Sequence, residues 1–457
     1  MRILTERQPP KKTPQVSFRE GDPSVEVRTN VAGQMVLEMS LGKPATLNRR
    51  GLILAFRHIV TVAKERKLDA LAIDFSSVRV FAGDMPDVEL AELLAVNLSL
   101  ADYAFEHYKT APREGFAHVK TVYLLHAAST RIRHGLRRGL IIGDETNQAR
   151  HVATMPASEM TPDSLARHAR RAVSGLPVRI TVWSHREIQR RGLAGVIAVG
   201  KGSVAKPRFI ILEYYGGKKT EKPTVLVGKG VTFDAGGINL KPTTAILGMN
   251  MDMSGGACVI HALAACARLK VRQNIIALIP AVENMISGAS YRPGDIIRTL
   301  SGKSIEVQDT DAEGRIILAD ALTWAARYQP RLVIDIATLT GSAVVALGER
   351  SSALFTEDEV LEAKFRHIGL AVGDPVWPLP LWDEYLDDIK GTYGDLGNVG
   401  NTKWGGAITA AIFLKQFVNY PWAHIDIAPR MTTIQGEHLA KGSAGAGVQL
   451  LIRWFSK

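Results

Sequence analysis

Residues 223–241 read PTVLVGKGVTFDAGGINLK and join a buried strand to a polar, glycine-rich loop. Similar near-continuous apolar runs lie on either side of it in the chain: PRFIILEY (207–214), NIIALIPAV (274–282) and RLVIDIATL (331–339). Such runs are typical of strands buried on both faces of a sheet. Helices are expected to begin at Ser254 and near Ala312, between these runs. The alternation predicts an α/β fold, with helices flanking a mostly parallel or mixed sheet.

The N-terminal third shows the same alternation with shorter runs, such as ALAIDF (70–75) and TVYLL (121–125), between stretches of helical period. The first 20 residues are rich in proline and charge and offer little to bury. We therefore expect a flexible tail over residues 1–20, an α/β domain over 21–147, a linker helix region over 148–165 and a larger domain over 166–457.

The composition is that of a globular protein, with 46% hydrophobic and 22% charged residues. No apolar run reaches the roughly 18 residues needed to span a bilayer, and the N-terminus lacks the apolar core of a secretory signal. Two cysteines, Cys258 and Cys266, are too few for a disulfide framework or a thiolate metal site. We expect a cytoplasmic protein with no membrane segment.

Candidate ligands gather directly after the apolar runs, where an α/β sheet collects its ligands at the carboxyl ends of strands. Three loops supply four carboxylates, and the same segments contain three cationic side chains: Asp234, Asp252, Asp311 and Glu313, with Lys229, Lys241 and Arg315. Converging carboxylates repel one another unless cations lie between them. Oxygen ligands suit Mg²⁺ or Mn²⁺, and Zn²⁺ also accepts carboxylates.

Each motif also has a simpler interpretation. Gly228-Lys229-Gly230 could be a phosphate loop, but it lacks the GxxxxGK[ST] spacing. Asp311-Ala312-Glu313 alone fits an acidic helix start, where anions favour the macrodipole. It is the combination of the segments that favours a metal site.

Six segments carry a family resemblance: VGKGVTFDAGGINLKP (227–242), MDMSGGA (251–257), ENMISGASYRPGDII (283–297), DTDAEGRIILADAL (309–322), IDIATLTGSAVVALG (334–348) and GGAITAAIFL (405–414) with WAHIDIA (422–428) after it. From about Gln148 to Leu451 the chain resembles the leucine (cytosol) aminopeptidase family of di-metal exopeptidases. The resemblance implies a small N-terminal macro-like domain, a C-terminal peptidase domain and a homohexamer.

The resemblance also implies residue roles. One metal would be held by Asp234, Asp311 and Glu313, with the Asp311 carbonyl also reaching it. The second would be held by Lys229, Asp234, Asp252 and Glu313. Lys241 matches the charged catalytic lysine, and Arg315 matches the arginine that holds a bicarbonate ion serving as general base. Met249, Thr338 and Gly341 match positions that line the pocket for the first side chain, and the Leu339 carbonyl matches one that receives the substrate amine.

Elementary chemistry agrees with these roles. Two divalent ions, with Mn²⁺ or Zn²⁺ expected and Mg²⁺ or Co²⁺ as further candidates, lower the pKa of a shared water, which can attack the first peptide bond. A free α-amine is needed at a metal, so peptides would lose N-terminal residues. An apolar pocket favours leucine-like side chains but separates neighbours by only about 1–3 kcal/mol per methylene.

Four departures from the family pattern are present. Asp309 stands where asparagine is usual, Ala235 where serine is common, and Asn250 where a basic or small residue is more usual. The segment PRMTT (429–433) replaces a small-residue run after WAHIDIA. These changes bear on the walls of the substrate pocket, while all the predicted metal ligands are present.

A second function is suggested by charge. The formal net charge is +11, and residues 131–191 contain 12 arginines, no lysine and five acids, a local excess of +7. We call these 12 arginines the arginine belt. Such a stretch could contact nucleic-acid phosphates in a regulatory or architectural role, with or without peptidase activity. It has almost no interleaved aromatic residues, which favours a solvated surface or subunit contacts.

Overall fold

A computed structural model describes residues 1–5, 8–22, 24–31, 33–44 and 47–456. The chain forms two compact units. Unit 1 contains residues 1–147 and 433–442, and unit 2 contains residues 148–432 and 443–457. The first boundary falls inside the long helix α4 (Thr130–Thr154). The short segment 433–442 thus belongs to unit 1 although it lies far along the chain in sequence.

Unit 1 is built on a sheet whose described strands follow the order β1-β6-β5-β2-β4-β3. All pairs are parallel except β3 with β4. The strands are β1 (Arg2–Leu4), β2 (Gln15–Arg19), β3 (Ser24–Thr29), β4 (Met35–Ser40), β5 (Ala70–Asp74) and β6 (Thr121–Leu125). The helices before α4 are α1 (Arg49–Glu65), α2 (Phe75–Arg79) and α3 (Asp87–Asp102).

The structure corrects two of the predicted boundaries. The described residues of the range 1–20 are not a flexible tail, because β1 and β2 pair within the sheet and the side chains of Val16 and Phe18 are buried. Two alternating apolar residues among polar and charged neighbours are too few to predict a strand from the sequence. Residues 148–165 are not a separate linker, since the end of α4 and the start of α5 (Pro162–Ala172) belong to unit 2.

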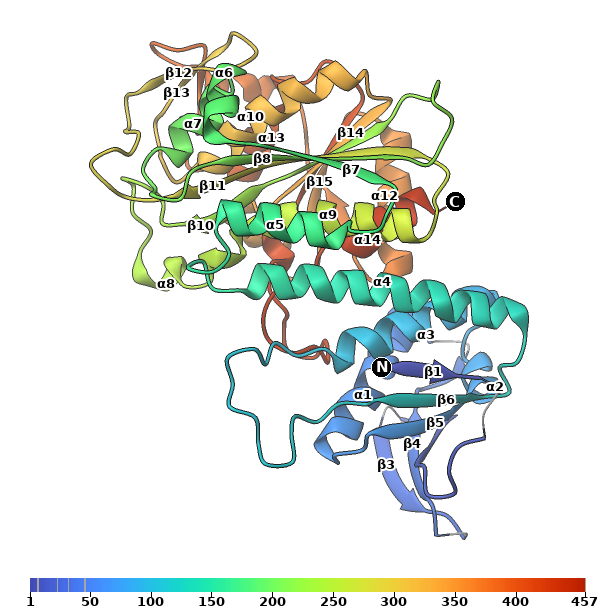
Figure 1. Ribbon diagram of the computed structural model, residues 1–457. Coiled ribbons are helices and arrows are strands. Elements are labelled where there is room, and N and C mark those ends of the chain that lie inside the picture. The colour runs from blue at the N-terminus through green and yellow to red at the C-terminus, as the bar shows by residue number, and fades with distance from the viewer. Residues whose placement is uncertain (6–7, 23, 32, 45–46, 457) are drawn as a thin grey trace. The chain divides into compact units, whose positions relative to one another are not determined.

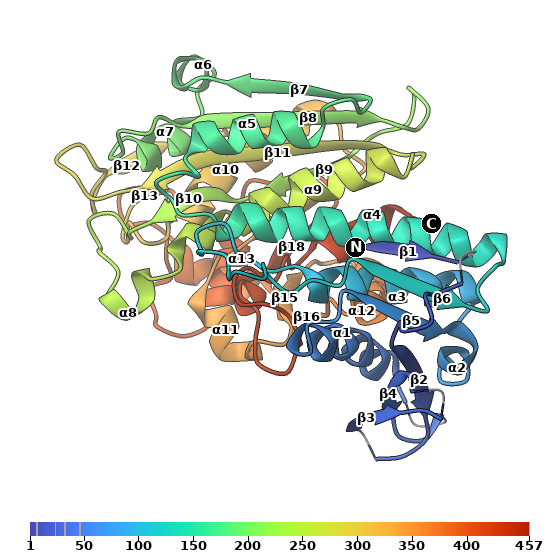
Figure 2. The same cartoon turned by 60° about the horizontal axis from the view of Figure 1, so that its bottom comes forward.

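Unit 2 contains a mixed sheet of order β16-β15-β18-β14-β9-β11-β8-β7, with β10 paired to β11. The strands are β7 (Val178–Trp183), β8 (Arg208–Tyr215), β9 (Thr224–Gly228), β10 (Gly230–Asp234), β11 (Asn274–Asn284), β14 (Leu332–Ala337), β15 (Ser352–Phe355), β16 (Val376–Pro378) and β18 (Trp422–Asp426). The four strands predicted from apolar runs are confirmed as β8, β9, β11 and β14. Figure 2 shows β7 at one edge of this sheet.

Helices cover both faces of the central, parallel part of this sheet (Figure 1). On one side lie α5, α9 (Ser254–Arg268) and α14 (Val448–Phe455); on the other lie α7 (Ala194–Gly200), α10 (Glu313–Ala325) and α13 (Gly406–Lys415). A large buried cluster lies on the second side, where β9 contributes Val225 and Val227, and α10 and α13 contribute Ile316 and Phe413. The fully buried strands β9, β11 and β14 fit this two-sided cover.

Shorter elements complete unit 2. They are α6 (His185–Arg190), α8 (Thr243–Ile246), α11 (Gly341–Leu347), α12 (Glu359–Val372), the 3₁₀ helices η2 (Met249–Met253), η3 (Ala326–Tyr328), η4 (Asp383–Ile389) and η5 (Ala428–Arg430), and a small sheet of β12 (Ile296–Arg298), β13 (Ser304–Glu306) and β17 (Leu396–Gly397). Over the described residues, no helix is both long enough and apolar enough to cross a membrane.

Helices α5 and α9 meet through two histidines, and this contact predicts a pH dependence of stability. The Nε2 atoms of His168 and His261 lie 2.9 Å apart. Burial, together with the neighbouring His261 and Arg171, lowers the pKa of His168 to about 3. An unfolded imidazole binds its proton near pH 6.5, so acidification from pH 6.5 favours the unfolded chain. We expect His168 to remove about 2 kcal/mol of unfolding free energy between pH 7 and pH 5.

The test compares urea unfolding of the wild type and His168→Gln at the two pH values. The variant should lose less stability on acidification than the wild type does. The exposed His134 on α4 provides a matched control, H134Q, which should keep the wild-type pH dependence. Equal pH dependence in all three proteins would contradict the prediction.

Candidate functional site

The predicted site residues of unit 2 come from strand ends and helix starts. Lys229 lies between β9 and β10, and Asp234 is the last residue of β10. Asp252 lies in η2, and Glu313 is the first residue of α10. Asp311 precedes α10 in the same loop. Parallel strands that end at one edge of the sheet therefore bring together residues separated by up to about 80 positions in the sequence.

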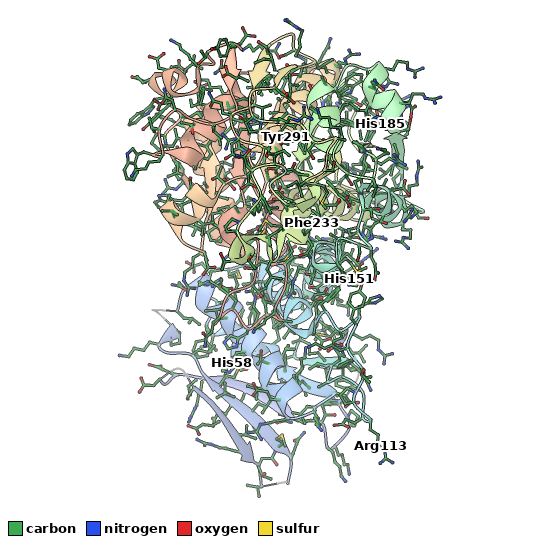
Figure 3. All side chains as sticks on the ribbon, turned by 90° about the vertical axis from the view of Figure 1, so that its left-hand side faces the viewer. His58, Arg113, His151, His185, Phe233 and Tyr291 are labelled. Atoms are coloured by element: carbon green, nitrogen blue, oxygen red, sulfur yellow. The ribbon has the colours of Figure 1, made fainter. Side chains whose placement is uncertain are left out.

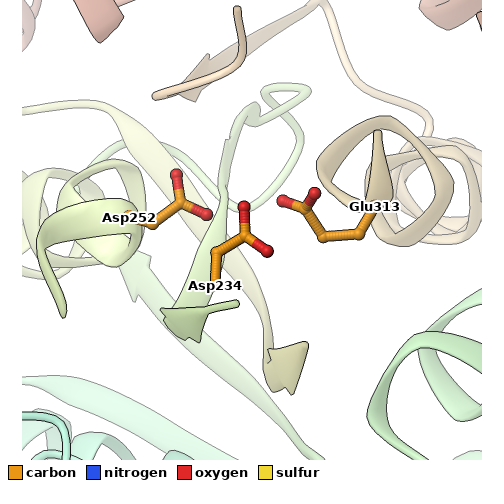
Figure 4. Close-up of side chains that lie close together, drawn as sticks. All are labelled: Asp234, Asp252 and Glu313. Carbon is orange, nitrogen blue, oxygen red and sulfur yellow. The ribbon is translucent and has the colours of Figure 1, made fainter. Parts of the chain in front are cut away.

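Three of the four predicted carboxylates form a compact buried group. Asp234, Asp252 and Glu313 each place one oxygen within 4.8 Å of the others, and their side chains point toward one another (Figure 4). Their residues are only 2%, 4% and 1% exposed. Asp311 lies beside this group and is more accessible, with 32% of its side chain exposed.

Two lysines connect the carboxylates. The Lys229 Nζ lies 2.8 Å from Asp252 Oδ2 and 2.8 Å from Glu313 Oε1. The Lys241 Nζ lies 2.9 Å from Asp234 Oδ2 and 2.6 Å from Asp311 Oδ1. Burial alone would lower the pKa of both lysines, but the surrounding carboxylates raise it above the ordinary value. Both ammonium groups are therefore protonated in this arrangement.

The charges within the group do not balance. Four carboxylates face two ammonium groups, so the ionised cluster carries two uncompensated negative charges. Burial raises the pKa of Asp252 and Glu313, and neighbouring carboxylates add to the shift. Burial and Asp234 together raise the pKa of Asp311 to about 7. Two divalent cations would relieve this repulsion, because buried anions need paired positive charge.

Unused ligand atoms fit the same interpretation. Asp252 Oδ2, Asp311 Oδ1 and Glu313 Oε1 are buried and accept no well-directed hydrogen bond, although lysine nitrogens lie near them. Each of these oxygens has a lysine Nζ at 2.6–2.8 Å as an ion-pair partner and keeps lone pairs that a cation can use. A set of carboxylate oxygens without thiolates suits hard divalent cations. The residues present therefore fit a metal centre.

Arg315, in the first turn of α10, has donors to spare beside this group. Its Nη1 donates to the Asn398 carbonyl at 2.7 Å, while its buried Nε has no hydrogen-bond partner. Burial lowers the pKa of Arg315 to about 10, so the guanidinium stays charged at neutral pH. Its free donors suit a small planar anion, which guanidinium groups bind through paired hydrogen bonds.

The predicted pocket residues have different surroundings. The Thr338 hydroxyl donates to Asp252 Oδ1 at 2.7 Å, and its carbonyl accepts from Lys229 Nζ at 2.8 Å. The Leu339 N–H donates to the buried Asp426 at 3.0 Å. Met249 lies in η2 and Gly341 begins α11. Thr338 thus supports a carboxylate in addition to any contact with a substrate.

Buried amides hold the loop before α10, and sequence reasoning did not assign them. Asn284 Nδ2 donates to Asp234 Oδ1 at 2.8 Å and to the Thr310 carbonyl at 2.9 Å. The Tyr291 hydroxyl (Figure 3) donates to the same carbonyl at 2.7 Å. Asn398 contacts the loop from the other side. Asn284 ends an apolar strand and could have been suspected on that ground, whereas Asn398 lies in a glycine-rich stretch with no comparable signal.

Two departures from the family pattern have a structural account. Asp309 Oδ1 accepts the Asp311 N–H at 2.8 Å, a turn contact that an asparagine oxygen could also make. Asn250 Nδ2 lies 3.1–3.3 Å from the carbonyls of residues 153–155, at the end of α4. Neither side chain takes part in the carboxylate group.

The arginine belt is not a continuous set of free cations. It divides between the two units. Arg138 pairs with Glu92, and Arg179 pairs with Glu213. Arg150 is fully buried, and Arg191 stacks over Trp183 with its guanidinium carbon 4.2 Å from the ring centre. These arginines therefore form contacts within the chain, and their presence does not require a nucleic-acid partner.

The close approach of α10 to Lys229 gives a stability prediction. A Cβ added at Gly314 would lie 2.7 Å from Lys229 Cε and 2.8 Å from its Nζ. The lysine is enclosed by carboxylates and cannot move without losing its ion pairs. We expect Gly314→Ala to lower the free energy of unfolding by about 1–3 kcal/mol, as overpacking does, although alanine usually favours a helix.

Gly288 provides the matched control for this measurement, because nothing lies within 4 Å of an added Cβ there. Gly288→Ala should leave the urea unfolding midpoint nearly unchanged. A Gly314→Ala variant as stable as the wild type would show that Lys229 is not confined as described.

Comparisons with known proteins show the family to which the chain belongs. A sequence profile described as "Cytosol aminopeptidase family, catalytic domain" matches residues 147–452. A probable cytosol aminopeptidase of Syntrophotalea carbinolica is 43% identical over 80% of this chain and 75% of its own length. One of Roseiflexus castenholzii is 40% identical over 93% of this chain and 88% of its own. The solved bottromycin maturation enzyme BotP in complex with Mn is 30% identical, with a TM-score of 0.88 over 97% of this chain and 98% of its own. This chain belongs to the cytosol aminopeptidase family.

Proposed function

We propose that this protein, a peptide hydrolase by its family, removes apolar, leucine-like N-terminal residues from peptides with the help of two bound divalent ions. The observation that carries the proposal is the carboxylate group of Asp234, Asp252, Asp311 and Glu313, whose four negative charges the two lysines only half neutralise. Such a group is costly unless cations complete it. We expect Asp234 and Glu313 to be shared by the two ions.

The first ion would be held by Asp234, Asp311 and Glu313, and the second by Lys229, Asp234, Asp252 and Glu313. Mn²⁺ and Zn²⁺ are the proposed ions, because both accept carboxylate oxygens and Zn²⁺ also accepts nitrogen. The similar enzyme BotP was solved in complex with Mn. Two such ions supply a water of lowered pKa and a polarised substrate carbonyl.

Lys229 and Lys241 have separate roles in this proposal. Lys229 is buried on all sides and must release its proton to bind a metal, so ion binding and proton release are coupled. Lys241 is held by Asp234 and Asp311, and their charge keeps its ammonium protonated. A protonated Lys241 can donate to the oxygen that becomes negative at the substrate carbonyl, a contribution worth about 3–4 kcal/mol.

Arg315 is the proposed anchor of a bicarbonate ion. Its buried Nε lacks a hydrogen-bond partner, and its Nη1 is fixed by the Asn398 carbonyl. The guanidinium can therefore bind a planar anion in one orientation. Bicarbonate held there supplies a general base that no side chain at this position provides.

Met249, Thr338 and Gly341 are proposed to line the pocket for the first side chain, and the Leu339 carbonyl to receive the free α-amine. The Leu339 backbone is held by Asp426, which also accepts from the Thr340 hydroxyl at 2.7 Å. A peptide with a blocked amine would lose this contact. We further propose a homohexamer in the cytoplasm, on the family resemblance alone.

Hydrolysis of leucine-p-nitroanilide tests the metal proposal. We expect activity with added Mn²⁺, loss of activity after chelation, and a fall in kcat of at least about 10²-fold in Asp252→Ala, because one metal position loses its carboxylate. The exposed Asp84 in unit 1 gives a matched control, D84A, with wild-type activity expected. N-acetyl-leucine-p-nitroanilide should not be cleaved. Equal rates with metal, without it and in Asp252→Ala would refute the proposal.

Bicarbonate dependence tests the role of Arg315. In bicarbonate-free buffer the wild-type kcat should fall, and added bicarbonate should restore it. Arg315→Met should lower kcat by about 10²-fold or more and abolish the response to bicarbonate, because the general base is no longer held. A variant that still responds to bicarbonate would place the anion elsewhere.

A further inference from the structure

Asn398 lies directly after β17, and its side chain is fully buried. Its backbone N–H donates to the Glu306 carbonyl at 3.0 Å, which fixes it beside β13. Residues 308–312, the stretch that leads into α10, run past this position. No chemical role has been given to Asn398 in the site described above.

Both the oxygen and the nitrogen of the Asn398 side-chain amide form hydrogen bonds with the backbone of that stretch. Its Oδ1 accepts the N–H of Gln308 at 2.7 Å and the N–H of Asp309 at 3.2 Å. Its Nδ2 donates to the Asp309 carbonyl at 2.5 Å and lies 3.4 Å from the Ala312 carbonyl. These contacts bracket Asp311 and end one residue before Glu313. The amide thus holds the backbone on both sides of a proposed metal ligand.

The backbone carbonyl of Asn398 forms a hydrogen bond with Arg315, outside the loop. Its carbonyl accepts Arg315 Nη1 at 2.7 Å, and this is the guanidinium whose buried Nε is unpaired. One residue therefore connects the loop that carries Asp311, just before α10, to the cation proposed to bind an anion. A shift of Asn398 would move the two relative to each other.

The chemistry of the contacts explains why an amide is required. Accepting from two N–H groups and donating to two carbonyls needs both an oxygen and an NH₂ group. A carboxylate could accept but not donate, and it would add a charge to a group that already carries excess negative charge. A neutral amide holds the loop without changing that balance.

Other contacts also hold this loop, and they limit how far it can move when Asn398 is replaced. Thr310 is held independently, because its carbonyl accepts from Asn284 and Tyr291 and its N–H donates to Asn239 Oδ1 at 3.0 Å. Loss of Asn398 would therefore free the residues flanking Thr310 while leaving Thr310 in place. The loop should loosen but remain near its position.

We propose that Asn398 is a positioning residue that sets where the proposed metal ligand Asp311 lies relative to the guanidinium of Arg315. The expected effect on metal binding rests on the proposed two-metal function. The positioning of the loop by Asn398 depends only on hydrogen bonds within this chain. Removal of a group that orients metal ligands commonly weakens metal binding by 10- to 100-fold.

The test uses the full-length, metal-free chain with Mn²⁺ as the probe. Isothermal titration calorimetry should show Asn398→Ala binding Mn²⁺ at least about 10-fold more weakly than the wild type. Hydrogen exchange should be faster in residues 307–312 of the variant and unchanged in β14. Asn398→Asp keeps the acceptor oxygen and should keep the Gln308 and Asp309 amides protected. The exposed Asn401, three residues away, provides the control Asn401→Ala, which should match the wild type.

Three outcomes would overturn the inference. Equal Mn²⁺ affinity and equal loop exchange in Asn398→Ala and the wild type would remove the positioning role. Loss of protection in β14 as well would assign Asn398 to the general fold. Unprotected Gln308 and Asp309 amides in Asn398→Asp, with β14 intact, would show that the side-chain oxygen does not hold them. A wild type that binds no Mn²⁺ would instead count against the proposed function, and the exchange data would still decide the role of Asn398.

Discussion

Repulsion among carboxylates is the constraint on which the centre of unit 2 depends. Asp234, Asp252 and Glu313 are buried within a few ångströms of one another, and Asp311 lies at their edge. In a medium of low dielectric such a group is stable only with positive charge between its members. Lys229 and Lys241 supply half of that charge. The negative charge that remains uncompensated makes the group suitable for binding divalent ions.

The fold satisfies this constraint with rigid and neutral supports. Parallel strands bring the ligands to one edge of the sheet, and α10 begins at Glu313 with a glycine next to it, which leaves room for Lys229. The backbone of the loop before α10 is held by the amides of Asn284 and Asn398. Neutral hydrogen bonds fix the ligands in place without competing with metal ions for the carboxylates.

Much of unit 2 could be predicted from sequence, because buried strands such as β9 and β14 are long apolar runs and their ends hold unusual clusters of charge. The structure brings Lys229, Lys241 and the four carboxylates together as those clusters indicated. Local patterns could not show that β2 pairs within the sheet of unit 1, or that residues 433–442 join that unit. There the buried Arg57 pairs with Glu437, 380 residues away, and donates to Asn97. The role of Asn398 could not be predicted from the sequence, because a single amide gains such a role only from long-range contacts.

The most direct measurement of the central claim is an anomalous difference map at the manganese absorption edge, from crystals of the wild-type protein grown with Mn²⁺. The account predicts two peaks in each chain, both contacting Asp234 and Glu313, with Asp252 and Lys229 beside one and Asp311 beside the other. An absence of peaks within the carboxylate group, with Lys229 and Lys241 still paired to the carboxylates at saturating Mn²⁺, would contradict it.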